Sequence, residues 1–222
     1  MKLRNAALFV LALLALPSAG LADFEIPLKD VFGADSGWSA LVPDHATTGI
    51  VVDQVGGDYV RIEVAKTFDD FDVNVITFYQ RLPDAQTVAT IRIDDEIVHN
   101  NTGGNWTRYL WAIDGAAAAL DKPATEASVF DVSPFTSKTW GPTQAGWSDP
   151  GHVAWLLAGD GVVADGETFS PGLAGGSLYI DVDLSGQGRS FQLKQMPIPE
   201  PATLVVLATG AAGLLIRCRR ER

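Results

Sequence analysis

Three polar loops of the chain carry tryptophan beside glycine, amide or carboxylate side chains. They are the stretch 99–106, Gly37-Trp38-Ser39 and Gly146-Trp147-Ser148. Aromatic faces stack on the C–H surfaces of sugars, while Asn and Asp side chains bind hydroxyl groups, so loops of this composition suit carbohydrate. The alternative is that the tryptophans fill the core or pack over sheet edges. The candidate glycan-binding residues are Asn101, Asn105, Trp106 and Trp147.

Two acidic clusters invite comparison with calcium loops. The run Asp181-Val182-Asp183-Leu184-Ser185-Gly186 resembles the opening of such a loop, but its twelfth position is Gln192, where a bidentate Glu is required. The run Asp69-Asp70-Phe71-Asp72 is typical of a strand entry with a charged outer face. We therefore expect no metal site and no cofactor.

The sequence contains few signatures of catalysis. The sequence has no nucleophile elbow, no zinc-protease helix and no phosphate loop. His45, His99 and His152 are far apart in the sequence, and their spacing indicates no shared site. A pair of carboxylates could imitate a glycosidase site, but acidic residues are too abundant here for such a pair to be informative. We expect a protein that is not an enzyme.

The net charge limits the kinds of partner, and the cysteine content limits how the domain can be stabilised. The formal net charge is −11, and each end of the chain contributes +2, so the residues between carry −15. A domain this acidic repels phosphate backbones, and we expect no nucleic-acid partner. The single cysteine, Cys218, lies in the basic tail, so the central domain must be stable without disulfides.

The central residues 23–196 have the pattern of strands. Apolar and polar residues alternate along 60–64, 71–75, 88–98 and 178–184, as expected where one face of a sheet is buried. Turn signals such as Gly56-Gly57 and Leu82-Pro83-Asp84 separate the runs. We predict one all-β domain, an antiparallel two-sheet sandwich of the jelly-roll type.

Two segments of this domain are expected to be irregular or helical. The alanine-rich stretch Gly115–Leu120 is the one helix candidate, although it is short and ends near Pro123. The stretch Pro134–Gly151 is rich in Pro, Gly, Ser and Thr and is predicted to be a long loop.

The first 22 residues have the features of a signal peptide. Lys2 and Arg4 precede an apolar run of 11 residues, Ala6–Leu16, which is short for a membrane span of about 20 residues. Small residues then occupy the positions that signal peptidase reads, and cleavage is predicted between Ala22 and Asp23.

The last 26 residues, 197–222, have three parts. The segment Pro197–Pro201 is stiff and extended because proline fixes φ and restricts its predecessor. The uncharged run Ala202–Ile216 follows, and as a helix it rises only about 22 Å, short for a hydrocarbon core of roughly 30 Å. A basic end then favours a cytoplasmic location for the C terminus. Its arginines are Arg217, Arg219, Arg220 and Arg222.

This tail resembles the PEP-CTERM sorting signal, in which a Pro-Glu-Pro motif precedes a short apolar helix and terminal arginines. Here the motif is Pro199-Glu200-Pro201. The resemblance implies recognition by an exosortase, an integral-membrane cysteine transpeptidase of Gram-negative bacteria that make exopolysaccharide. It covers the tail alone and implies nothing about the domain. The alternative is a plain transmembrane anchor that is never processed.

Together these features predict an exported protein. After signal peptidase acts, the tail anchors the chain transiently in the inner membrane, and an exosortase-like enzyme passes the domain to the cell surface or extracellular matrix. We expect a structural or adhesive role, with exopolysaccharide as a possible partner. A secreted carbohydrate-binding module and a secreted glycan hydrolase are the alternatives.

Overall fold

The computed structural model describes residues 23–42, 48–185 and 189–200. None of the helices within these ranges has the length and apolar character that crossing a membrane requires. The predicted signal peptide, with Ala22, and the predicted transmembrane helix lie outside the described residues, as do Pro201 and the four arginines.

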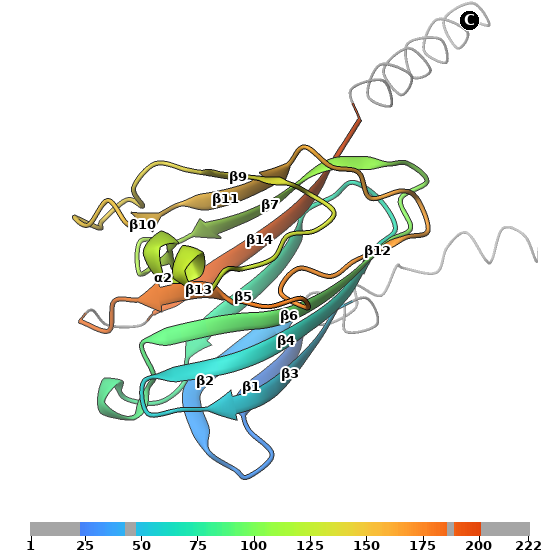
Figure 1. Cartoon of the computed structure of the whole chain (residues 1–222). Helices are drawn as coiled ribbons and strands as arrows, with labels where there is room; N and C mark the ends of the chain where they lie inside the picture. Colours follow the sequence, from blue (N-terminus) through green and yellow to red (C-terminus); the bar gives the residue numbers. More distant parts are fainter. Residues whose placement is uncertain (1–22, 43–47, 186–188, 201–222) are drawn as a thin grey trace, which may run out of the picture.

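Two β-sheets face each other across one core (Figure 1). The first sheet contains, in spatial order, β1 (Phe24–Lys29), β2 (Asp35–Val42), β5 (Asn74–Gln80), β14 (Ser190–Pro199), β7 (Trp106–Asp114), β11 (Trp155–Gly159) and β9 (Ser137–Trp140). The second contains β10 (His152–Val153), β8 (Ala118–Asp121), β13 (Leu178–Val182), β6 (Thr90–Asn100), β4 (Tyr59–Phe68) and β3 (Thr48–Val55), and β12 (Thr168–Phe169) also pairs with β6. The predicted all-β class is confirmed.

The sheets are not purely antiparallel, which corrects part of the prediction. Strands β4 and β6 run parallel, with Tyr59 opposite Thr90 and Phe68 opposite Asn100. The reason is the path of the chain, because β5 lies between them in sequence but belongs to the opposite sheet and returns the chain to the starting end. The finer expectation of jelly-roll connectivity stays a prediction.

The core is aromatic at its centre. Strand β7 buries Trp106 at its start and then, from Tyr109 onward, every second residue, and Trp106, Tyr109 and Trp111 are all fully buried. Phe169 of β12 meets Tyr109 edge to face at a centroid distance of 5.1 Å. Each such ring removes a large apolar area from water, worth about 1.5–3 kcal/mol, so the domain needs no disulfide to be stable.

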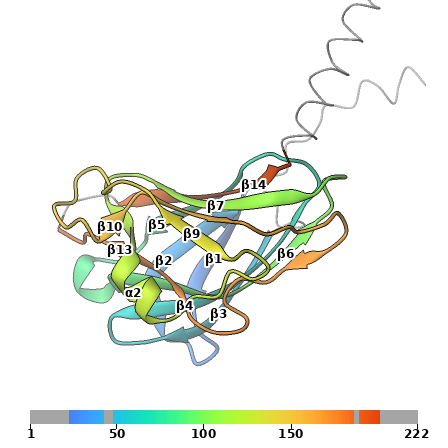
Figure 2. The same ribbon diagram turned by 45° about the horizontal axis from the view of Figure 1, so that its top comes forward.

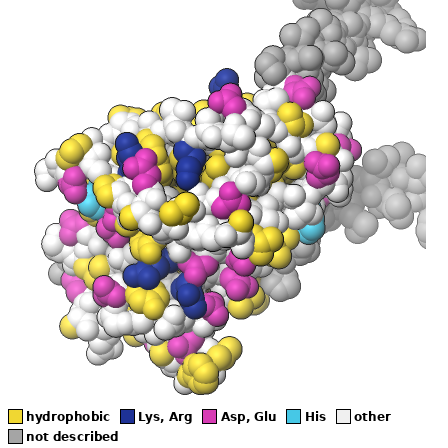
Figure 3. Space-filling model, viewed as in Figure 1, with side chains coloured by type: hydrophobic (Ala, Val, Ile, Leu, Met, Phe, Trp, Pro, Cys, Tyr) yellow, Lys and Arg dark blue, Asp and Glu magenta, His cyan; other side chains and the backbone are white. Residues whose placement is uncertain are grey.

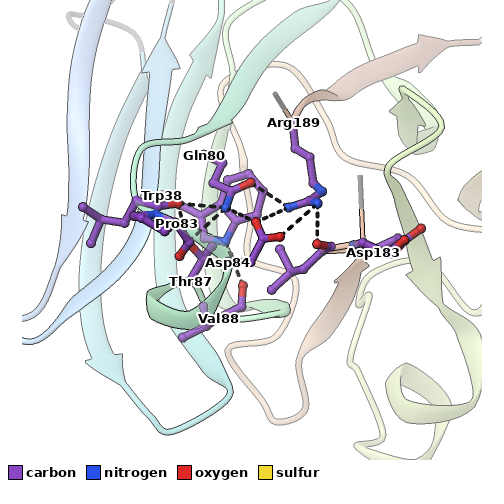
Figure 4. Close-up of polar contacts among 11 residues, drawn as sticks. Trp38, Gln80, Pro83, Asp84, Thr87, Val88, Asp183 and Arg189 are labelled. Carbon is purple, nitrogen blue, oxygen red and sulfur yellow. Dashed lines mark hydrogen bonds and ion pairs between the residues drawn. The ribbon is translucent and has the colours of Figure 1, made fainter. Parts of the chain in front are cut away.

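A buried arginine closes one end of the sandwich (Figure 4). Arg189 donates from Nη1 to Gln80 Oε1 at 2.8 Å and to Asp84 Oδ1 at 2.7 Å, and its other amino group donates to the carbonyl of Leu184. Asp84 begins the short 3₁₀ helix η1 (Asp84–Gln86) at the predicted turn. The Gln80 amide and the Arg189 guanidinium hold the pKa of Asp84 below its usual value. The turn is thereby attached to the start of β14.

The helix expected at Gly115–Leu120 is wrong. Ala118–Asp121 is strand β8, and the helix α2 follows it at Lys122–Ala127. Pairing of β8 with β13 buries the alanines, and this tertiary contact overrides their helix propensity. The predicted loop Pro134–Gly151 likewise contains an edge strand, β9.

Glycine at position 172 is required by a close backbone approach. Its φ is +86°, and a Cβ placed there would lie 1.8 Å from the carbonyl oxygen of Asp94 in β6. The segment around it follows the edge of β6 between the partners β12 and β13, where Glu96 N donates to Pro171 O at 3.0 Å. Any side chain at 172 therefore forces this segment off the strand.

We predict that Gly172→Ala costs about 3 kcal/mol or more, because steric overlap adds to backbone strain. The matched control is Gly166→Ala, where φ is +79° and nothing lies within 4 Å of the added carbon. The control has only the backbone cost of about 1–2 kcal/mol. Urea denaturation measures both, and equal losses would contradict the close approach.

Candidate functional site

The two ends of the sandwich differ in what they carry. At one end β4 and β6 finish, β7 begins and β14 finishes, which places Pro199 beside Trp106. At the other end β6 begins, and the end of β13 lies beside it, with Asp181 opposite Thr90. Figure 2 shows β14 and β7 running together to the end from which the chain leaves. Candidate residues occur at both ends.

The start of the sorting tail belongs to the folded domain. Strand β14 extends through Pro197, Ile198 and Pro199, beyond the predicted domain end at 196, and Glu200 N donates to Asn105 O at 3.2 Å. Pairing with β5 stops at Gln195, so the prolines lie where β14 has a partner on one side only. Proline lacks an N–H donor and is tolerated at such one-sided positions.

The extended form predicted for this segment is therefore found, but much of it is covered. Pro199 is buried and Glu200 is half-buried. The Asn105 side chain donates to Glu200 Oε1 at 3.4 Å. Asp23 directly precedes β1, and its predicted role as the mature N terminus stays a prediction.

The structure places Trp147 apart from the other three candidate glycan-binding residues, Asn101, Asn105 and Trp106. Trp106 is fully buried and meets Phe68 edge to face at 5.6 Å, so the prediction that its ring receives a sugar is wrong. Asn101 donates to Asp69 Oδ1 at 3.2 Å. Asn105 is bonded to Glu200, as described above. Ring burial in a sandwich depends on which face a residue occupies, and the glycine-rich loop before Trp106 gave no indication of this.

Trp147 is different, because it lines a groove of about 460 Å³ at the opposite end. Its Nε1 donates to Ala116 O at 3.1 Å, and its ring stacks on His152 with centroids 4.3 Å apart. These contacts hold the indole in one orientation beside the groove. The other lining residues are Ala89, Thr90, Gly146, Ser148, Asp181, Val182, Asp183 and Leu184.

A polar group lies beside this groove that sequence reasoning missed. Asp121, His152 and Asp181 each offer a ligand atom, and these atoms lie within 4.8 Å of one another. The His152 ring lies 3.2 Å from a carboxylate oxygen of Asp149 on one side and of Asp181 on the other. The group could hold a cation, and the expectation of no metal site stays untested.

The surroundings of this group explain its geometry. His152 and Asp121 are cross-strand neighbours of β10 and β8, a pairing that no sequence spacing indicates. Asp121 Oδ1 also accepts from Ala124 N at 2.9 Å and so caps α2. Burial raises the pKa of the Asp121 carboxyl, and the nearby Asp181 charge adds to this rise. Asp181 lies on the outer face of β13, as predicted.

Comparison with known proteins identifies the tail. Residues 197–220 match the PEP-CTERM protein-sorting motif, which confirms the resemblance. No curated protein matches the chain. Among solved structures, the insecticidal crystal protein Cry2Aa is similar at 10% identity and a TM-score of 0.24, over 61% of this chain and 23% of that one. At that TM-score the likeness carries no conclusion about fold or function.

We predict that two tryptophan substitutions separate core from groove. Trp106→Ala removes a fully buried ring and is expected to cost about 3–5 kcal/mol of unfolding free energy. Trp147→Ala removes a partly exposed ring with one hydrogen bond and is expected to cost about 1–2 kcal/mol. Chemical denaturation monitored by far-UV circular dichroism compares them. A larger loss at Trp147 would contradict this assignment.

Proposed function

We propose that the β-sandwich is a structural or adhesive module, displayed at the cell surface or in the exopolysaccharide matrix of a Gram-negative bacterium. The sorting motif supports export and processing by an exosortase, a membrane enzyme. In this proposal signal peptidase first removes residues 1–22, and the tail then holds the chain in the inner membrane until the exosortase-like enzyme acts.

The observation that carries the proposal is the continuity of β14 with the sorting motif. The motif match begins at residue 197, inside the strand, so no spacer separates the sandwich from the tail. The domain is therefore held close to the membrane that the tail is proposed to enter. The Trp147 groove lies at the far end and faces away from this attachment. A module arranged in this way presents its distal end to the surroundings.

The domain is proposed to act by contact rather than catalysis. Asp181 Oδ1 accepts from Thr90 Oγ1 at 2.9 Å, Asp183 Oδ1 accepts from Ser185 N at 2.8 Å, and Asp121 caps a helix, so these three carboxylates at or beside the groove have structural partners. The visible face in Figure 3 mixes acidic and basic side chains without one dominant basic patch, which suits an acidic secreted protein. A glycan hydrolase remains the less favoured alternative.

A carbohydrate-binding module is the second candidate. It is favoured by the Trp147 groove, where an oriented indole lies beside Thr90, Asp181 and Asp183. An aromatic face with adjacent hydroxyl and carboxylate groups fits a sugar ring and its hydroxyls. The earlier candidates Asn101, Asn105 and Trp106 lie at the other end and form no part of this site.

The sorting step is tested on protein released from a host with an active exosortase. We expect the mature chain to lack the segment that ends in Arg217, Arg219, Arg220 and Arg222. Replacing Pro199, Glu200 and Pro201 by alanine should leave uncut protein in the inner membrane. Neutral residues at the four arginines should instead impair retention and orientation. Mass spectrometry decides, and released protein still carrying Arg222 would mean that the tail is a plain anchor.

The glycan site is tested by a binding screen on a chain ending at Glu200, which keeps all of β14. If the second candidate holds, Trp147→Ala should weaken binding at least about tenfold, equal to 1.4 kcal/mol. The matched control is Trp140→Ala on β9, a partly buried tryptophan outside the groove. Absence of binding to every polysaccharide tested favours the purely structural role, and release of reducing ends would favour the hydrolase.

A further inference from the structure

Three polar side chains occupy inward positions where the strand pattern calls for apolar residues. Lys66 follows Val60, Ile62 and Val64 on the buried face of β4. Glu96 of β6 and Gln195 of β14 point into the same space. Lys66 is 2% exposed, and Glu96 and Gln195 are 0% exposed. Burying charge is unfavourable unless each group has a partner, so this cluster requires an explanation.

The three side chains contact one another directly. Lys66 Nζ lies 3.3 Å from Glu96 Oε1 and donates a hydrogen bond to Gln195 Oε1. Gln195 Nε2 donates to the same Glu96 oxygen. The amine therefore lies next to the carbonyl group of the glutamine, and the carboxyl group contacts both the amine and the amide nitrogen. Lys66 and Gln195 come from opposite sheets and are 129 positions apart.

The cluster is shielded from solvent and is contacted by an aromatic side chain. Trp111 Nε1 donates to Glu96 Oε2 at 3.0 Å, which orients the carboxyl group. The fully buried Tyr109 ring packs edge to face against Trp111, with the ring centroids 4.7 Å apart. A low dielectric disfavours the charged forms of the Lys66 amine and the Glu96 carboxyl group. Transfer of a proton from the amine to the carboxyl group, which makes both neutral, is therefore favoured in such a site.

We propose that Lys66 and Gln195 become joined by an intramolecular isopeptide bond between Nζ and Cδ, with Glu96 as the catalytic proton carrier. The bond would cross-link β4 to β14 through the core. No metal, oxidant or external reagent is required. The chain would thus catalyse its own modification after folding.

The reaction balances as an amide exchange. Glu96 takes a proton from the Lys66 ammonium, which leaves a neutral amine with a free electron pair. That pair attacks Gln195 Cδ, and the C=O electrons move onto Oε1. Protonated Glu96 then gives its proton to Nε2 and accepts one from Nζ, the carbonyl reforms, and the Cδ–Nε2 bond breaks. The ammonia that leaves takes the proton that Glu96 now holds. The ammonium side chain and the carboxamide thus become a secondary amide and one ammonium ion, Glu96 returns to a carboxylate, and no oxidation state changes.

The environment favours the first step. Burial lowers the pKa of the Lys66 amine, so its neutral, nucleophilic form is more accessible than in water. Glu96 contacts the amine that must lose a proton and the nitrogen that must leave. A positioned acid–base group and a fixed approach of the reacting atoms are the two requirements of such a reaction.

The bond would have a mechanical consequence. Gln195 lies on the strand that leads directly into the sorting tail. Tension applied through the C-terminal end enters the domain through β14. A covalent link to β4 in the facing sheet would keep β14 in place, and it would also restrict the unfolded chain.

The test is mass spectrometry of the full chain, exported by a Gram-negative host without exosortase and then denatured and digested. With the bond present, trypsin cannot cut after Lys66, and a branched peptide joins residues 62–81 to the peptide that begins at Gln195. Its mass should be the sum of both peptides less one ammonia. A digest with chymotrypsin is also needed, because a glutamine freed at a peptide N terminus can lose ammonia by itself.

Variants assign the roles. Glu96→Gln keeps the shape of the site but removes the proton carrier, and it should abolish the branched peptide and restore cleavage after Lys66. Gln195→Met should do the same. The matched control, Gln192→Met, changes an outward-facing glutamine of the same strand and should keep the bond. The wild-type digest decides even if a variant fails to fold. Unmodified Lys66 and Gln195 peptides from folded wild-type chain would overturn the proposal and leave a buried ion pair only.

Discussion

The contact of Lys66 with Glu96 and Gln195 constrains the rest of the sandwich. A strand that slipped by one residue would turn every side chain to the other face, and here it would separate a buried charge from its partner. Removing one partner of a buried pair is costly, at about 3–5 kcal/mol. The cluster therefore specifies how β4 and β6 of one sheet lie against β14 of the other, which hydrophobic burial alone would do less strictly.

Strand β14 is the element on which the other features converge. At its start Arg189 ties it to the turn around Asp84, and in its middle Gln195 reaches the buried cluster. At its end it becomes the sorting motif without a spacer. From Gln192 to Gln195 β14 lies between β5 and β7, so the strand that continues into the tail is anchored within the first sheet.

The end where the tail attaches and the end with the groove carry different features. The tail leaves beside Trp106, and the loops at that end are bonded mainly to one another, as in the contact of Asn101 with Asp69. The groove beside Trp147 and the neighbouring group around His152 occupy the other end. Sequence order conceals this, since Trp106 and Trp147 both follow polar, glycine-containing loops. The Trp106 ring lies in the core because Trp106 is the first residue of β7 and faces inward. The Trp147 ring belongs to a loop and borders the groove.

The sequence by itself determined the features that depend on local order along the chain. The sorting motif at residues 197–220 and the alternation of β4 and β13 are of this kind, as is the predicted signal peptide, because targeting motifs and strand periodicity are properties of consecutive residues. The alternation also places Lys66 and Gln195 at inward positions of their strands, which indicates buried polar side chains. Only the tertiary structure decided that Lys66 meets Gln195, that Asp121 lies beside His152 and that Trp106 is buried. The physical reason is that each depends on which strands pair and which faces meet, and those contacts join residues far apart in sequence.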